Sequence, residues 1–378
     1  MLDISLIMLG AGDSSRFKMP TKKQWLRIAN EPLWLYASKN LAKMLPFKKI
    51  IIAAKENEIA YMKRFEPSFE YIIGGKTRQQ SLKNALNFVN SEYVMTSDIA
   101  RPCILPELIS RLINQLNNAQ CIVPALKVAD TAILGSTSIN RDELKLIQTP
   151  QISRLGLLKK ALENNEDFTD DSQAISAIGA KICYVQGDEK ARKITFKDDL
   201  AYLNLPKADK VFFSGNGFDV HSFCAGEYIT LCGVKIPYIK ALKAHSDGDA
   251  PLHALCDAIY GASGLGDIGE HFPDTNERYK DACSKGLLAN CVKMVRNFGF
   301  DIVNADITIL AQQPKITPFK EQMRQNVASI LGVNENFVNI KATTMEKMGF
   351  IGREEGIGAL ASVSLKYYQW HKDIKKFY

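Results

Sequence analysis

The sequence predicts an α/β protein made of two domains. The chain has 378 residues, which is more than one typical domain needs. Its first half alternates short β-type runs with amphipathic segments of helical length. Imidazole side chains, by contrast, occur only in the second half of the chain, at His221, His245, His253, His271 and His371. Any histidine chemistry therefore belongs to the second domain.

The strands expected in the first domain are short apolar runs at 4–9, 49–54, 70–73, 93–97, 119–124 and 181–185. Helical patterns fall between several of these runs, for example at 77–89 and 106–117. Strands that alternate with helices favour a mostly parallel, Rossmann-like sheet with helices on both faces. Ligands of such sheets bind at the carboxyl ends of the strands.

A domain boundary is expected in the segment 204–210, which is rich in polar residues. After this segment a new strand-like run begins at Val211, and the residue pattern of the sequence changes. We therefore expect one domain at residues 1–207 and a second at residues 211–378.

The composition is that of an ordinary globular protein, with 46% hydrophobic and 24% charged residues. No run approaches the roughly 18 to 20 apolar residues of a membrane span, and the N-terminus lacks the features of a signal peptide. The eight cysteines form no CxxC pair, which favours reduced thiols. We therefore expect a cytoplasmic protein with no membrane partner. The net charge of +7 suits anionic substrates, and the lack of long basic runs argues against nucleic acid.

A loop of small residues follows the first predicted strand, at residues 10–17. Such a loop lets backbone N–H groups approach phosphates, and Arg16 and Lys23 are placed to cradle a triphosphate. Asp98 ends another apolar run, where a carboxylate can hold Mg²⁺ between phosphate oxygens. Each feature has a plainer interpretation, because glycine turns are common in α/β proteins and a single aspartate is more often a helix cap.

Together these segments resemble 2-C-methyl-D-erythritol 4-phosphate cytidylyltransferases over residues 1–205. The matching segments are residues 12–16, 23–24, 74–78, 98–102 and 149–151, with departures at Ser14, Thr21 and Ser97. The resemblance implies that Arg16 and Lys23 stabilise the transition state as a substrate phosphate attacks the α-phosphorus of CTP, in the presence of Mg²⁺ or Mn²⁺. It also implies substrate contacts from Arg141 and Lys193, and nucleotide contacts from Gly12, Gly75, Lys76, Ser81, Asp98 and Arg101.

The strongest pattern in the sequence is Asp219-Val220-His221 followed by a second motif that ends at His253. Alternate residues of a strand point to one side, so Asp219 and His221 share a face. Two imidazoles, a carboxylate and an open position make a catalytic zinc site. A single histidine is more often an ordinary core or surface residue, but the combination favours a metal. Asp257, one helical turn after His253, either orients its ring or has no part in the site.

The second half resembles 2-C-methyl-D-erythritol 2,4-cyclodiphosphate synthases, through its D-x-H, HSDGD, GDIG, FPDT and KATT-x-E-K segments. The resemblance implies an α+β sandwich domain of the trimeric type, with Zn²⁺ or a similar metal at Asp219, His221 and His253. It implies transition-state roles for His245 and Thr344, and a second cation, Mg²⁺ or Mn²⁺, at Glu346. The cytosine pocket would include Lys315. The implied substrate contacts, besides those of Asp219 and His221, are Ser246, Asp267, Ile268, Gly269, Phe272, Asp274, Asn276, Thr343, Glu346, Phe350 and Arg353.

The implied second reaction closes a ring when the 2-phosphate attacks the β-phosphorus of a cytidine diphosphate ester and CMP leaves. Because the resemblance implies sites between subunits, we expect Glu346 and the zinc ligands of one site to come from different chains or faces. The partners are then small molecules and further copies of the chain, in a homotrimer or hexamer.

Two alternatives remain at this stage. One is a general sugar-phosphate nucleotidyltransferase fused to a metal-dependent phosphohydrolase, against which Arg141 and Lys193 stand at methylerythritol-recognition positions. The other is a basic, metal-stabilised nucleic-acid-binding or scaffolding protein, which the weak basic pattern disfavours. Choice among CTP, UTP and GTP distinguishes the first, and salt-dependent binding the second.

Overall fold

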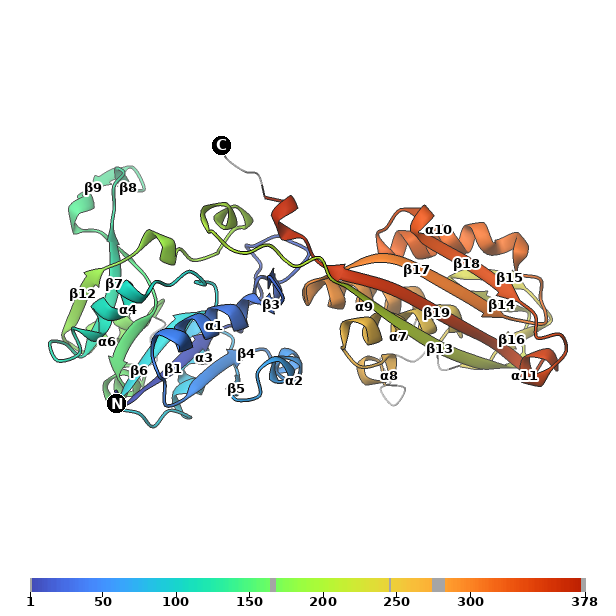
Figure 1. The fold of residues 1–378 in the computed structure, drawn as a ribbon, viewed down its shortest axis with the longest axis horizontal. Helices are drawn as coiled ribbons and strands as arrows, with labels where there is room; N and C mark the ends of the chain where they lie inside the picture. Colours follow the sequence, from blue (N-terminus) through green and yellow to red (C-terminus); the bar gives the residue numbers. More distant parts are fainter. Residues whose placement is uncertain (1, 164–167, 245, 274–282, 375–378) are drawn as a thin grey trace. The chain divides into compact units, whose positions relative to one another are not determined.

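The computed structural model describes all residues except 1, 164–167, 245, 274–282 and 375–378. The chain divides into two compact units (Figure 1). Unit 1 comprises Met1–Ala208 and the residues from Gln369 onward, and unit 2 comprises Asp209–Tyr368. The division after Ala208 lies inside the predicted boundary segment. The predicted second domain extended to residue 378, whereas unit 2 ends at Tyr368.

An eight-stranded sheet forms the centre of unit 1, in the order β10-β7-β11-β6-β1-β4-β5 with β12 beside β7. Its pairs are parallel from β6 through β1 and β4 to β5, and between β7 and β12. The antiparallel strands β10 and β11 were not predicted. The strands are β1 (Ile4–Leu9), β4 (Ile50–Ala54), β5 (Glu70–Ile73), β6 (Tyr93–Asp98), β7 (Cys121–Lys127), β10 (Lys145–Ile147), β11 (Gln151–Arg154) and β12 (Ile182–Gln186).

Helices cover this sheet, as predicted, and every residue of the central strand β1 is buried. Leu82 and Leu86 pack with Ile7 and Leu9 in a core that lies on one face. A small hairpin, β2 (Arg27–Ile28) with β3 (Glu31–Pro32), precedes the first helix, and a second, β8 (Ala132–Leu134) with β9 (Thr137–Ile139), follows β7. The helices are α1 (Leu33–Met44), α2 (Glu56–Phe65), α3 (Arg78–Leu86), α4 (Pro106–Ile113), α5 (Leu155–Ala161) and α6 (Asp171–Ala177).

Unit 2 is built on a five-stranded sheet in the order β16-β13-β19-β17-β18, in which only β17 and β18 are parallel. Helices α7 and α9 contact β17, and α10 contacts β18, which confirms the α+β arrangement (Figure 1). The strands are β13 (Phe212–Ala225), β14 (Tyr228–Leu231), β15 (Val234–Pro237), β16 (Lys240–Leu242), β17 (Phe300–Leu310), β18 (Val338–Thr343) and β19 (Gly356–Tyr367). The helices are α7 (Ala250–Ser263), α8 (Ile268–His271), α9 (Ser284–Asn297), α10 (Lys320–Leu331) and α11 (Gly349–Gly352).

Two glycines of β13 allow α7 to pack directly on the strand. A Cβ atom on Gly215 would lie 2.1 Å from the carbonyl oxygen of Ala258, and one on Gly217 would lie 2.0 Å from that of Ala254. Because alternate strand residues share a face, Asp219 and the histidine two residues later also point toward α7. The glycine spacing therefore aims the D-x-H motif at the helix that carries His253.

The C-terminal segment belongs to unit 1 because Trp370 is buried there. Its side chain is 4% exposed, and its indole Nε1 donates a hydrogen bond of 2.8 Å to the carbonyl oxygen of Arg27. Ala208, where the chain leaves the unit, forms a β-bridge with Ala29. The chain therefore leaves unit 1 and returns to it at two points that both lie next to β2. Within the described part of the chain, no helix has the length and apolar character of a membrane span.

We expect Trp370→Ala to lower the free energy of unfolding of unit 1 by about 3 to 5 kcal/mol, because it leaves a cavity and removes the hydrogen bond to the Arg27 carbonyl. Amide hydrogen exchange should become faster in β1 and α1 and stay unchanged in β13 and β19. Lys372→Ala, at an exposed position of the same segment, is the control. Unaltered exchange in unit 1 of the tryptophan variant would contradict a stabilising role of the segment.

Two candidate active sites

A cavity of about 970 Å³ opens at the carboxyl ends of β1, β5 and β6 in unit 1. Leu9, Ile73 and Asp98, the last residues of these strands, lie in its wall. Basic side chains outnumber acidic ones there, which suits a polyphosphate. The cavity brings together these residues predicted to act in the first domain: Gly12, Arg16, Lys23, Gly75, Lys76, Ser81, Asp98 and Lys193.

The glycines at 74 and 75 bring two loops of the cavity into contact. A Cβ atom on Gly74 would lie 2.3 Å from that of Ala11, and one on Gly75 would lie 2.0 Å from Cγ of Gln80. Ser81 secures this turn, because its hydroxyl accepts a hydrogen bond from the Gly75 N–H at 3.0 Å and donates one to the Thr77 carbonyl at 2.9 Å. The structure thus gives Ser81 a role in shaping the loop, and its nucleotide contact stays a prediction.

A chain of hydrogen bonds holds the Lys23 backbone against the glycine-rich loop. Ser14, with φ of 56°, adopts the left-handed conformation that favours glycine. Its hydroxyl donates to Oε1 of Gln24 at 3.0 Å and accepts from the Lys23 N–H at 3.3 Å. The Gln24 amide donates at 3.2 Å to the buried carboxylate of Glu58, which also pairs with Lys22 at 2.6 Å. The Ser14 side chain therefore links the glycine-rich loop to Lys23 and Gln24.

The Lys23 ammonium faces the cavity and donates a hydrogen bond of 2.8 Å to the carbonyl oxygen of Ile194. Burial, and next the charge of Lys193, lower the pKa of Lys23 to about 8 against the opposing effect of Asp98. The side chain is therefore a cation at neutral pH, but one that loses its proton more easily than an exposed lysine.

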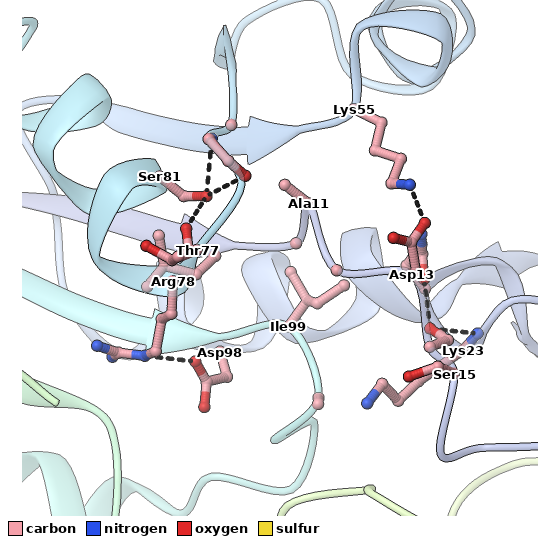
Figure 2. Close-up of a pocket in the computed structure, with 18 of the residues that line it drawn as sticks. Ala11, Asp13, Ser15, Lys23, Lys55, Thr77, Arg78, Ser81, Asp98 and Ile99 are labelled. Atoms are coloured by element: carbon pink, nitrogen blue, oxygen red, sulfur yellow. Dashed lines mark hydrogen bonds and ion pairs between the residues drawn. The ribbon is translucent and has the colours of Figure 1, made fainter. Parts of the chain in front are cut away.

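Asp98 is an anchor for two cations, as Figure 2 shows for one of them. Its carboxylate pairs with Lys193 Nζ at 2.7 Å and with Arg78 Nε at 3.5 Å. Burial raises the pKa of Asp98, but Lys193 and Arg78 outweigh it and hold the pKa well below its usual range. Arg78 also binds the buried Asp171 at 2.7 Å. A magnesium ion at Asp98, as predicted, would share the carboxylate with these two side chains.

Two residues predicted for the first site do not line the cavity. Arg101 is buried and donates to the Ala191 carbonyl at 2.6 Å. Arg141 begins the 3-10 helix Arg141–Glu143, beyond the β8–β9 hairpin, and donates to the Ala129 carbonyl at 2.7 Å. Conversely, Arg78 lines the cavity although no individual role was predicted for it. The sequence had indicated Arg78 only through its place in the matched segment 74–78.

In unit 2, Asp219, His221 and His253 converge on one point. Asp219 Oδ2 lies 3.0 Å from His221 Nε2 and 3.1 Å from His253 Nδ1, and the two nitrogens are 3.3 Å apart. Donor atoms at the corners of a tetrahedral zinc site, with bonds of about 2.0 Å, lie about 3.3 Å from one another. The three side chains therefore fit a single divalent ion. They are also the one such ligand cluster found among the described residues.

The pKa values in this cluster reflect the same contacts. Burial raises the pKa of Asp219, but hydrogen bonds from His221 and His253 outweigh it and hold the pKa well below the usual range. Burial lowers the pKa of His253, and the bond to Asp219 outweighs that effect and raises it. The carboxylate therefore stays ionised, which is the form that binds a metal.

The surroundings of His253 differ from the expectation for Asp257. Oδ1 of Asp257 accepts a hydrogen bond of 2.8 Å from the Ile268 N–H and so holds the start of α8. The His253 Nε2 atom faces Ser284 Oγ at 2.8 Å and Ser246 Oγ at 3.3 Å. Asp257 was one possible hydrogen-bond partner of the His253 ring. Ser284 occupies that position instead, and no feature of the sequence had indicated it.

Glu346, the predicted second cation ligand, follows a strand far from the cluster. In the sheet register, Asp219 is opposite Ala359, Ala359 is opposite Ile309, and Ile309 is opposite Ala342. Three strand spacings separate Asp219 from Ala342, about 14 Å. Within one chain the two predicted metal positions are therefore distinct.

The remaining predicted residues of unit 2 that the structure describes occupy two places. The α8 region holds Asp267, which caps the helix, with Ile268, Gly269 and Phe272. The carboxyl ends of β17 and β18 and the segments that follow them hold Lys315, Thr343, Thr344, Phe350 and Arg353, and the Thr344 hydroxyl donates to Glu346 at 2.6 Å. Three predicted residues, His245, Asp274 and Asn276, lie outside the described part of the chain.

Comparison with known proteins assigns each unit to a family. The model of 2-C-methyl-D-erythritol 4-phosphate cytidylyltransferase matches residues 4–205, and that of the YgbB family matches residues 212–366. The bifunctional enzyme IspD/IspF of Campylobacter fetus subsp. fetus (strain 82-40) is 58% identical over 370 residues, 98% of this chain and 99% of that protein. The corresponding enzyme of Campylobacter concisus (strain 13826) is 56% identical over 371 residues, with coverage of 98% and 99%.

A solved structure agrees over both units. That of the bifunctional IspDF from Campylobacter jejuni has 52% sequence identity and a TM-score of 0.94, covering 98% of this chain and 100% of that one. The similarity thus extends through both catalytic units in one order along the chain. This chain belongs to the family of bifunctional IspD/IspF enzymes, with a 2-C-methyl-D-erythritol 4-phosphate cytidylyltransferase unit followed by a unit of the YgbB family.

Proposed function

We propose that unit 1 transfers CMP from CTP to 2-C-methyl-D-erythritol 4-phosphate and releases pyrophosphate. Unit 2 cyclises 4-CDP-2-C-methyl-D-erythritol 2-phosphate to 2-C-methyl-D-erythritol 2,4-cyclodiphosphate and releases CMP. The observation that carries this assignment is that the two family matches fall on two separate units, each with its own site. The full-length similarity to bifunctional relatives leaves the alternative fusion with a phosphohydrolase without support.

In unit 1 the reaction needs positioning and positive charge more than covalent chemistry. A substrate phosphate oxygen attacks the α-phosphorus of CTP, and negative charge grows on the oxygens of the phosphoryl group and of the leaving pyrophosphate. Arg16 and Lys23 face the cavity, where they stabilise that charge. Lys193, oriented by Asp98, binds the phosphate of the methylerythritol substrate. Mg²⁺ or Mn²⁺ accompanies the triphosphate.

We expect kcat/KM for CTP, followed as pyrophosphate release, to fall as the pH rises above about 8. A lysine loses its positive charge as pH increases through its pKa, and the pKa of Lys23 in the free enzyme is about 8. Lys23→Arg keeps its charge at these pH values, so its alkaline decline should move upward. CMP release by unit 2 is the internal control. The same decline in the arginine variant would assign it to another group.

In unit 2 we propose Zn²⁺ at Asp219, His221 and His253, where it supplies Lewis-acid stabilisation to a substrate phosphate. Ser246, which lies beside His253, contacts the substrate. The loop at the start of α8, held by Asp257, offers backbone N–H groups to the phosphates. A second cation, Mg²⁺ or Mn²⁺, is proposed at the carboxylate of residue 346.

We further propose a homo-oligomer built on a trimer of unit 2. The three strand spacings between Asp219 and Ala342, at the end of the strand that precedes Glu346, support sites shared between chains. The face of β13 that points away from α7 supports it too, because Phe218 and its cross-strand neighbour Leu360 are 50% and 46% exposed. A cytoplasmic location is supported by the eight cysteines, all of which are free thiols.

The test combines zinc analysis with separate assays of the two products. The substrate of unit 2 carries one more phosphate than the product of unit 1, so each substrate is supplied on its own. We expect one zinc per chain, CMP release that stops on chelation, and pyrophosphate release with CTP in preference to UTP and GTP. A preference for another nucleotide would contradict the first assignment, and metal-free cyclisation would contradict the second. Sedimentation equilibrium should give a multiple of three chains.

A further inference from the structure

On the basis of the metal centre proposed above, we propose that Ser284 and Asp247 determine which ring nitrogen of His253 faces the metal ion. They act as positioning residues, because they reach the ion only through the imidazole. Neither had a predicted role, although Asp247 lies within the second motif of the sequence.

Ser284 connects the far side of the His253 ring to Asp247. It is the first residue of α9 and is fully buried. Its Oγ lies 2.8 Å from His253 Nε2, and its backbone N–H donates to Asp247 Oδ2 at 3.1 Å. Its hydroxyl also forms a short hydrogen bond with Asp247 Oδ1. On the near side of the ring, His253 Nδ1 faces Asp219 at 3.1 Å and His221 at 3.3 Å.

The direction of these hydrogen bonds follows from the donors available. The carboxylate of Asp247 has acceptor oxygens only, so both donors of Ser284, its N–H and its O–H, are directed to it. The Ser284 oxygen can then only accept a bond from His253 Nε2. A neutral ring with its proton on Nε2 has its lone pair on Nδ1. Nδ1 is the atom that faces the other two ligands, so the pair selects the tautomer that a metal ion requires.

Ser246 lies near the same nitrogen but has less influence on it. Its Oγ is 3.3 Å from His253 Nε2, compared with 2.8 Å for Ser284. It accepts a bond of 3.3 Å from the Gly248 N–H, which leaves its own hydroxyl free to rotate. The directional bond to the ring therefore comes from Ser284.

Helix packing sets the distance between the ring and the hydroxyl. His253 lies in the first turns of α7, and Ser284 begins α9, which packs against α7. Leu288 and Cys291 of α9 are fully buried, and the Cys291 thiol contacts the Cys256 carbonyl at 3.8 Å. The hydroxyl is thus held by the core of unit 2 and not by a surface loop.

Zinc affinity of the metal-free, full-length enzyme, measured by competition with a chromophoric chelator, tests the proposal. Ser284→Ala removes the acceptor for Nε2 and should weaken zinc binding about 10- to 100-fold, as loss of outer partners of metal-bound histidines does. Asp247→Asn keeps the size of the side chain but leaves one donor of Ser284 without an acceptor, so it should weaken binding too. Ser263→Ala, which removes a buried hydroxyl of α7 that bonds the Ile259 carbonyl at 3.0 Å, is the control and should bind zinc normally.

A second measurement reads the hydrogen bond at Nε2 without turnover. In the zinc-loaded, ¹⁵N-histidine-labelled enzyme, the proton on His253 Nε2 should exchange slowly with solvent because it is bonded to Ser284, and this protection should be lost in Ser284→Ala. Amide hydrogen exchange of β13 and β19 serves as a check that unit 2 of each variant is folded. Zinc affinity within twofold of the unaltered enzyme in either folded variant would overturn the proposal. An unaltered enzyme that binds no zinc would instead overturn the metal centre itself.

Discussion

We expect His253→Ala to abolish CMP release by unit 2 while pyrophosphate release by unit 1 continues unchanged. His253 supplies one of three donor atoms, the others being Asp219 Oδ2 at 3.1 Å and His221 Nε2 at 3.3 Å. Alanine leaves two ligands, which are too few for a tightly held ion. Loss of several kcal/mol of stabilisation by a Lewis acid corresponds to a rate about 10²- to 10⁴-fold lower.

Zinc content and both product assays are measured on the same preparations. His271→Ala removes another imidazole of unit 2, whose ring stacks on Tyr260 with centroids 4.2 Å apart, and this control should keep its zinc. A parallel loss of pyrophosphate release in the His253 variant would contradict independent catalysis by the two units.

Lys23→Ala should have the opposite effect and stop CTP consumption alone. The Lys23 ammonium is held at the cavity wall by the Ile194 carbonyl at 2.8 Å, and its backbone is attached to Ser14. A charge fixed in advance needs no reorganisation when the phosphoryl group becomes more negative. Removing one such group costs about 10²- to 10³-fold in kcat. Pyrophosphate release is the measurement, with CTP saturating so that kcat is separated from KM.

The matched control for this variant is Lys18→Ala. Lys18 lies in the same loop region, is exposed, and is not part of the cavity wall. Its φ of 51° is as unfavourable for alanine as for lysine, so backbone strain does not change. If the two variants lose pyrophosphate release equally, the effect comes from the overall charge of the loop and not from the position of Lys23.

Much of the sheet of unit 1 could be predicted because its strands are continuous apolar runs. The observed β1 and β5 have the predicted bounds, at Ile4–Leu9 and Glu70–Ile73. The antiparallel β10 and β11 were missed. They are three and four residues long, and their place in the sheet depends on pairing with β6 and β7, which no local pattern records.

The candidate sites likewise contain residues that the sequence could place and residues that it could not. Residues inside a motif, such as Asp219 and His221, could be placed on one side of a strand from their spacing alone. Arg101 and Arg141 were also predicted as site residues of unit 1, but neither lines its cavity. Their side chains bond backbone carbonyls elsewhere, and the direction of a long side chain depends on the partners that folding brings to it.

Local periodicity and residue chemistry were thus sufficient for the two-unit organisation, the cationic loop and the shared face of Asp219 and His221, since each depends on neighbours along the chain. His253 lies 34 positions from Asp219 and was added through its motif and the family resemblance. The return of Trp370 to the Arg27 carbonyl and the contact of Ser284 with His253 join residues 343 and 31 positions apart. No period of a strand or helix relates such positions. The packing of one element on another, and the burial it permits, decides which donor meets which acceptor.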